Sequence, residues 1–217
     1  MQTDNFCLKI GISFFLAFIF LFVGAFSFIL TRIKKVEMER SFYFLVADST
    51  HLEASVQVAI WSGGAAYIMD KCVVYSVYFS EEDGERVCKR TPKTKLIERK
   101  IEGLYLKTKK QKRKAKIYQT AFDNLYQCIR YLEDTIYLLD EGITHQVAKE
   151  KLASLSSHTQ CLQRTYNQSF TALANIFEAL SKELETISKQ TVLASKLRYL
   201  QCALADSYLH EAGEFLL

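Results

Sequence analysis

The stretch SFYFLVA, residues 41–47, decides the fold that we expect for this chain. Its aromatic and branched apolar side chains form an unbroken run, which is typical of a β-strand buried in a sheet. The next three residues, DST at 48–50, are of the types that cap helices, and Gly63-Gly64 has the composition of a helix end. The chain therefore begins a strand–helix unit at residue 41.

The same alternation of strand and helix signals continues to residue 105. The acidic residues that follow Ser80 predict a short helix through Cys88. The resulting order is β-α-β-β-α-β, which predicts a small α+β module of the split-βαβ or ferredoxin-like type for residues 41–105. Apolar, β-branched runs place its further strands at 65–69, 72–79 and 95–101.

From residue 106 the apolar period changes to that of an α-helix. Apolar side chains recur every three or four residues in three stretches, which we expect to be helices at about 118–139, 144–187 and 193–211. The segment 154–159, which holds three serines, marks a point where the second helix could bend. We expect an antiparallel helical bundle at 106–217, whose stripes form its own core or allow self-association through coiled-coil contacts.

Residues 10–30, IGISFFLAFIFLFVGAFSFIL, form an uncharged run of 21 residues. At ~1.5 Å rise per residue this run is long enough to cross the ~30 Å hydrocarbon core of a bilayer. It exceeds the usual apolar region of a cleaved signal peptide and lacks a small-residue cleavage site. We therefore expect a short tail at 1–9, an uncleaved transmembrane helix at 10–31 and a polar stalk at 32–40.

The module at 41–105 resembles the SPOR domain, a peptidoglycan-binding module of bacterial division and sporulation proteins. The resemblance implies that the soluble part faces the cell wall and that its sheet binds denuded glycan strands. A single membrane anchor at the amino terminus is also a common layout in that family. The matching stretches are FYFLVADS at 42–49, Glu53-Ala54, GAAYI at 64–68 and VYSVYFSEED at 74–83.

The expected sheet offers a candidate glycan-binding face. Two helices covering one face would pack against Phe42, Phe44, Val46, Tyr75 and Val77. The opposite face would then expose aromatic and hydroxyl groups of the kind that bind sugars. In the family a polar Gln often stands where Leu45 stands here. The candidate glycan-binding residues are Tyr43, Leu45, Ser76 and Tyr78.

The stretch KTKKQKRKAK, residues 107–116, carries seven basic residues in ten positions. Such a run attracts anionic lipid headgroups, at ~1 kcal/mol per basic residue close to the surface, or the acidic polymers of a cell wall. It lacks the interleaved aromatic residues of a single-strand nucleic-acid platform. A solvated helix start or linker is the alternative. The candidate anionic-surface residues are Lys107, Lys109, Lys110, Lys112, Arg113, Lys114 and Lys116.

The sequence contains no arrangement of residues that is typical of catalysis. The four histidines are scattered, and no nucleophile, metalloprotease or phosphate-loop motif occurs. The six cysteines show no paired spacing, which argues against a disulfide framework or a zinc site and favours buried reduced thiols. We expect no enzyme activity, no metal and no cofactor.

Two functions follow from these features. The first is a non-catalytic, single-pass protein of the bacterial cell membrane, with its soluble part on the wall side, that tethers the membrane to peptidoglycan in sporulation or division. The second is a cytoplasm-facing adaptor whose bundle recruits protein partners or oligomerises and whose basic run lies on lipid. The basic residues Arg32, Lys34, Lys35 and Arg40 favour cytoplasmic placement by the positive-inside rule.

Overall fold

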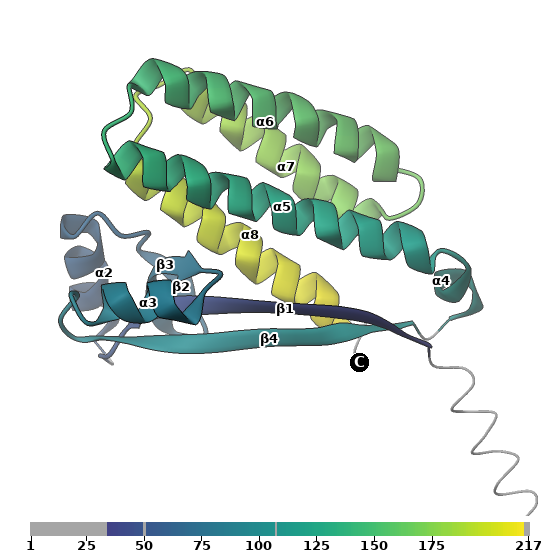
Figure 1. Ribbon diagram of the computed structural model, residues 1–217, viewed down its shortest axis with the longest axis horizontal. Helices are drawn as coiled ribbons and strands as arrows, with labels where there is room; N and C mark the ends of the chain where they lie inside the picture. The colour runs from purple at the N-terminus through teal and green to yellow at the C-terminus, as the bar shows by residue number, and fades with distance from the viewer. Residues whose placement is uncertain (1–33, 50, 107, 215–217) are drawn as a thin grey trace, which may run out of the picture.

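The computed structural model describes residues 34–49, 51–106 and 108–214 of the chain. They form an α+β fold in which a four-stranded antiparallel sheet carries helices on both faces (Figure 1). The strands are β1 (Lys34–Ala47), β2 (Tyr67–Met69), β3 (Cys72–Tyr78) and β4 (Thr94–Leu106). The helices are α2 (Leu52–Trp61), α3 (Glu81–Cys88), α4 (Lys109–Arg113), α5 (Ala115–Asp140), α6 (His145–Tyr166), α7 (Thr171–Ser188) and α8 (Ala194–Glu214).

Strand β1 lies inside the sheet, whose order is β2-β3-β1-β4. It pairs with β4 along almost its full length, from Lys34 opposite Leu106 to Ala47 opposite Thr94. The register shifts once, between Glu37 and Arg40, where a bulge interrupts the ladder. Because β3 pairs only with the second half of β1, the two long strands extend beyond the rest of the sheet as a two-stranded ribbon (Figure 1).

Both faces of β1 are buried in its second half. On one face, Phe42 is fully buried and its ring lies 5.7 Å from that of Tyr126 in α5 and 5.3 Å from that of Tyr208 in α8. On the other face, Leu45 is 2% exposed in a smaller apolar cluster beneath α2 and α3. Gly84 lets α3 approach the sheet, because a Cβ there would lie 2.7 Å from Leu96 Cδ1. Burial on two sides explains the unbroken apolar run at 41–47.

Helices α5 and α8 lie on the sheet, and the α6–α7 hairpin covers them from outside (Figure 1). One apolar core runs from the sheet through all four helices, from Val36 in β1 to Leu152 in α6 and Leu173 in α7. Polar contacts also join the two halves of the chain, including the 2.7 Å hydrogen bond from the Tyr67 hydroxyl to Asp206. The sheet and the helices therefore form one folded unit.

This architecture corrects the predicted fold class. Among the described residues, no helix is both long enough and apolar enough to cross a bilayer. The transmembrane helix that we predicted at 10–31 lies outside the described residues. The predicted module at 41–105 and the predicted helical bundle at 106–217 share the core described above.

The helical half contains four long helices in the described part of the chain, where we predicted three. The break lies between Tyr166 and Thr171 and not in the serine-rich segment 154–159. There Ser156 donates to the backbone oxygen of Ser181 at 3.1 Å, and Thr159 donates to that of Ser156 at 2.9 Å. Their buried hydroxyls are thus satisfied within the bundle, so the helix continues through them.

The predicted stalk was wrong from Lys34 onward, because these residues begin β1. Val36 and Met38 are buried on the side of the helices, whereas Glu37 and Glu39 are exposed on the other side. This alternation has the period of a strand, and the charged residues concealed it.

We predict that Phe42→Ala will lower the free energy of unfolding by about 3–5 kcal/mol, because it empties the centre of the aromatic cluster. Tyr43→Ala, on the next residue and the less buried side of the strand, should cost less than about 1.5 kcal/mol. Chemical denaturation of both variants checks this prediction. Equal losses would show that the two faces of β1 contribute alike.

A half-buried carboxylate lies where α5 meets the turn between β3 and α3. The pKa of Glu133 is raised to about 7, chiefly by burial and also by nearby Asp134 and Asp83, while Arg130 lowers it. A hydrogen bond with the Phe79 backbone also lowers this pKa. Arg130 itself lies 5.6 Å from the centre of the Phe79 ring. Glu133 therefore changes charge close to neutral pH.

We predict that Glu133→Gln will raise the thermal midpoint relative to the parent chain at pH 8 but not at pH 5. Between the ordinary carboxyl pKa and about 7, the folded state keeps a proton that the unfolded state has lost, so rising pH lowers the stability of the parent. The exposed Glu183 on α7 supplies the control, since Glu183→Gln should give a pH-independent difference. A pH-independent effect of Glu133→Gln would contradict this assignment.

Candidate lipid-facing surface

The basic run forms a short helix and the first turn of a long one. Thr108 caps α4 with a reciprocal pair of hydrogen bonds: its hydroxyl accepts from the Gln111 amide N–H at 3.1 Å, and the Gln111 side chain accepts from the Thr108 N–H at 2.9 Å. This capping box explains why a helix starts among like charges. Lys114 separates α4 from α5.

The sheet places this helix beside the start of β1. Lys34 pairs with Leu106, and α4 begins three residues after Leu106. Figure 1 shows α4 at the end of the β1–β4 ribbon, away from α2 and α3. Residues 10–30 precede Lys34 by only a few residues in the chain. Lys34, the first described residue, therefore lies at the same end of the fold as the basic run.

We call the described basic residues of this segment the basic end. Lys109, Lys110 and Arg113 are exposed, and none of these three forms an ion pair with another described residue. Ile117, 40% exposed, adds an apolar side chain next to them. Lys107 lies outside the described residues. The basic end consists of Lys109, Lys110, Lys112, Arg113, Lys114 and Lys116.

The chemistry of the basic end is electrostatic attraction without a shaped pocket. Flexible ammonium groups on a short exposed helix attract a dense layer of negative charge, and they provide no fixed geometry for a particular small anion. The exposed Ile117 suits a surface that is apolar beneath its charges. A layer of anionic lipid headgroups has both properties.

The candidate glycan-binding residues do not form an exposed face. Leu45 is 2% and Ser76 is 8% exposed, so the expectation that both face solvent was wrong. Ser76 donates a 2.8 Å hydrogen bond to the Tyr78 hydroxyl, and Tyr78 packs against the cluster beneath α2 and α3. Tyr43 and Tyr78 are each partly exposed, and the Tyr43 hydroxyl lies 3.3 Å from Glu98 Oε1.

Two physical reasons explain this difference. The helical half of the chain takes the Phe42 face of the sheet, so α2 and α3 cover the face that we expected to be open. In addition, the β1–β3 register shifts between Leu45 and Val46, which makes Tyr75 a bulge residue. Tyr75 then points toward α2, with Leu45, instead of toward Phe42.

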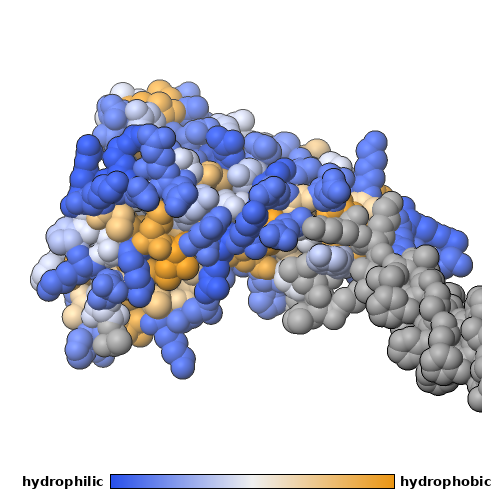
Figure 2. Space-filling model, turned by 60° about the horizontal axis from the view of Figure 1, so that its bottom comes forward, coloured by the Kyte–Doolittle hydropathy of each residue, from blue (hydrophilic) through white to orange (hydrophobic). Residues whose placement is uncertain are grey.

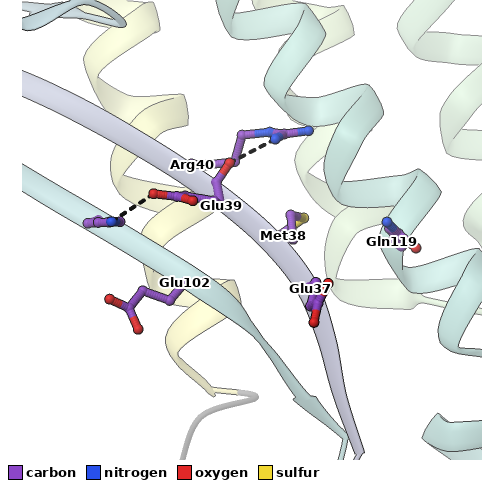
Figure 3. Close-up of a pocket in the computed structure, with 7 residues that line it drawn as sticks. Glu37, Met38, Glu39, Arg40, Glu102 and Gln119 are labelled. Carbon is purple, nitrogen blue, oxygen red and sulfur yellow. Dashed lines mark hydrogen bonds and ion pairs between the residues drawn. The ribbon is translucent and has the colours of Figure 1, made fainter.

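A hollow of about 540 Å³ lies beside the bulge of β1. Dashed lines in Figure 3 join Glu39 to Arg40 through its backbone oxygen and to Lys100 through its carboxylate. The Arg40 guanidinium also bonds to Asp123 at 2.8 Å and lies 4.8 Å from the centre of the Tyr126 ring. The lining residues are Glu37, Met38, Glu39, Arg40, Lys100, Glu102 and Gln119.

Most of the charged side chains in this hollow form ion pairs, and Arg40 joins the ribbon to α5 through Asp123. Two of the charged groups that line the hollow, Glu39 and Lys100, are paired with each other at 2.7 Å. Among the described residues, no group of three His, Cys, Asp or Glu side chains is placed to hold a metal ion. The thiols also stay unreactive where buried: burial raises the pKa of Cys128 to about 12.

Sequence reasoning missed the residues around this hollow. Arg40 was assigned to the stalk, yet it joins β1 to α5. The alternation of Val36, Glu37, Met38 and Glu39 was the available signal for a strand. The contact between Arg40 and Asp123, which lie 83 residues apart in the chain, had no local signal in the sequence.

Compared with known proteins, the chain matches no family model, no curated protein and no solved structure.

Proposed function

We propose that this protein is a non-catalytic adaptor that lies on a membrane, with its basic end against anionic lipid and its remaining surface free for protein contacts. The observation that carries the proposal is the placement of the basic end beside Lys34, within a few residues of the uncharged stretch 10–30. The uncharged stretch therefore joins the described fold at Lys34, at the end that carries the cluster of cations. Two such signals together give stable membrane attachment.

The charge pattern favours the cytoplasmic side. Arg32, Lys34 and Lys35 follow the uncharged stretch directly, whereas Lys9 alone precedes it closely. Basic residues flanking an apolar segment are retained in the cytoplasm, where the inner leaflet is also rich in anionic lipid. The basic end adds six further cations at the same place.

Tethering to peptidoglycan remains a prediction that rests on the resemblance to the SPOR domain. The burial of Leu45 and Ser76 removes half of its candidate binding face. Tyr43→Ala tests what remains, because its ring is the least covered of the four side chains. Unchanged sedimentation of this variant with purified sacculi would reject the site.

The basic end predicts a lipid-dependent protection of its own lysines. We expect Lys109 and Lys110 of the full chain to react more slowly with an aqueous amine reagent in nanodiscs that contain about one-third phosphatidylglycerol than in nanodiscs of phosphatidylcholine alone. The exposed lysines Lys182, Lys189 and Lys196 should react equally in both. Mass spectrometry of the modified peptides measures both groups in one sample.

Salt and charge removal sharpen this test. Protection should decline as ionic strength rises, because the Debye length falls from ~10 Å at 0.1 M to ~3 Å at 1 M. The triple change Lys109→Gln, Lys110→Gln and Arg113→Gln should remove about 3 kcal/mol of attraction and abolish the lipid-dependent protection of Lys114 and Lys116. The matched control removes the same charge elsewhere by Lys182→Gln, Lys189→Gln and Lys196→Gln. Equal reactivity in both lipids would reject the proposed contact.

Topology separates the two functions. A fusion of alkaline phosphatase or a fluorescent protein to Leu217 in a bacterial host reports the side on which the carboxyl end lies. Fluorescence without phosphatase activity is the result that we expect. Phosphatase activity without fluorescence would overturn the cytoplasmic placement and favour the wall-facing function.

A further inference from the structure

Helix α2 exposes several apolar side chains on its outer side, beside the polar Glu53 and Gln57. Two residues of the helix, Ser55 and Ala59, are buried on the side that packs against β3. Trp61 is nevertheless 82% exposed, Ile60 54% and Val58 47%. Figure 2 shows orange apolar side chains between blue polar ones on the left half of the molecule. Exposed apolar side chains gathered on one helix mark a contact surface.

The outer side of α2 carries a regular pattern. Ala54, Val58 and Trp61 are spaced i, i+4 and i+7, so they lie along one line of the helix. This is the spacing by which one helix packs against another. Glu53 is the only charged residue in α2. We call Ala54, Val58 and Trp61 the α2 stripe.

We propose that the α2 stripe is the contact between two copies of this chain, which pair their α2 helices antiparallel about a two-fold axis at Val58. On this axis Val58 packs against its own symmetry mate. Each Trp61 then lies over Ala54 of the other copy, where the small side chain leaves room for the indole ring. The stripe is therefore complementary to itself, as a two-fold contact requires.

The charges of α2 fit the same arrangement. Antiparallel pairing about Val58 separates the two Glu53 residues by five positions on each side of the axis, or about 15 Å along the helices. This separation exceeds the Debye length of ~8 Å at physiological salt, so the two carboxylates hardly repel each other. A parallel pair would instead bring the two Glu53 side chains together. The antiparallel pair is thus the favoured one.

The size of the contact sets its strength. A ten-residue helix is about 15 Å long, and an aromatic residue buries roughly 150–250 Å². Two Trp61 side chains contribute roughly 300–500 Å², and Val58 and Ala54 add less. The contact therefore stays below the ~1,000–1,200 Å² of specific interfaces and gives a weak dimer that depends on concentration. Attachment to a membrane would raise the effective concentration and favour the dimer.

The α2 stripe and the basic end are far apart. The 14 residues of β1 span about 45 Å at ~3.3 Å per residue, and the two surfaces lie near its opposite ends (Figure 1). Pairing through α2 therefore leaves the basic end open to lipid. The dimer rests on the geometry of α2 alone and does not depend on the proposed membrane contact.

Trp61 makes the proposal directly measurable, because it is the only tryptophan of the chain. We expect sedimentation velocity of the full chain in a mild detergent to show a monomer that converts to a dimer as protein concentration rises. The emission of Trp61 should move to shorter wavelength over the same concentration range. Val58→Glu should weaken the dimer by ~100-fold, because it places two carboxylates together at the axis.

Val147 supplies the matched control. It is an exposed valine in α6, 42% exposed against 47% for Val58, and Val147→Glu should leave the dimer unchanged. Circular dichroism checks that both variants stay folded. A conservative pair, Val58→Cys and Val147→Cys, gives an independent readout: oxidation should cross-link the first variant above the background of Cys161 and not the second.

Three results would overturn the proposal. The parent chain could stay monomeric at every concentration, or Val58→Glu could dimerise as well as the parent does. Alternatively, the Trp61 emission could shift only when lipid is added and without a dimer, which would assign the stripe to the bilayer. Each result is independent of the protection of Lys109 and Lys110, so the dimer and the lipid contact fail separately.

Discussion

The ring of Phe42 is where the two halves of the chain meet. It is fully buried and touches the rings of Phe44 and Phe79 from the sheet side and of Tyr126 and Tyr208 from the helices. Aromatic edge-to-face contacts fix the distance and tilt between sheet and helices more narrowly than aliphatic packing does. The position of β1 follows from this cluster. The basic end and the α2 stripe, at opposite ends of that strand, are placed relative to each other by the same contact.

Burial of both faces of β1 limits what the sheet is able to bind. A sheet that serves as a binding platform keeps one face open, and here α2 and α3 cover the second face at Leu45. The open part of the ribbon carries Glu37, Glu39 and Glu102, which is a polar surface without a shaped apolar floor. The surfaces left for function are therefore on helices, as charge at α4 and as apolar side chains at α2. Both suit contact with large surfaces better than capture of a small molecule.

Local signals in the sequence found all four strands, and the run 72–79 matches β3 closely, whereas the run 41–47 covers only the second half of β1. These signals failed where contacts between distant parts of the chain decide the local structure. The bulge at Tyr75 reversed the direction of one side chain, and nothing in the run of apolar residues around it distinguishes the two directions. The serine-rich segment 154–159 stayed helical because Ser156 finds its acceptor in another helix, at Ser181. The basic end was readable from composition, whereas its place beside Lys34 required the register of β1 with β4.

The pairing of β1 with β4 has a mechanical consequence. Attachment of the chain to a membrane ahead of Lys34 would direct any pull along the axis of β1, parallel to the strands. The hydrogen bonds between β1 and its two neighbours run across that axis, so many of them would carry the load at once instead of opening one after another. A helix at this position would unwind turn by turn under the same force. β1 is thus the part of the fold best suited to carry a load applied at Lys34.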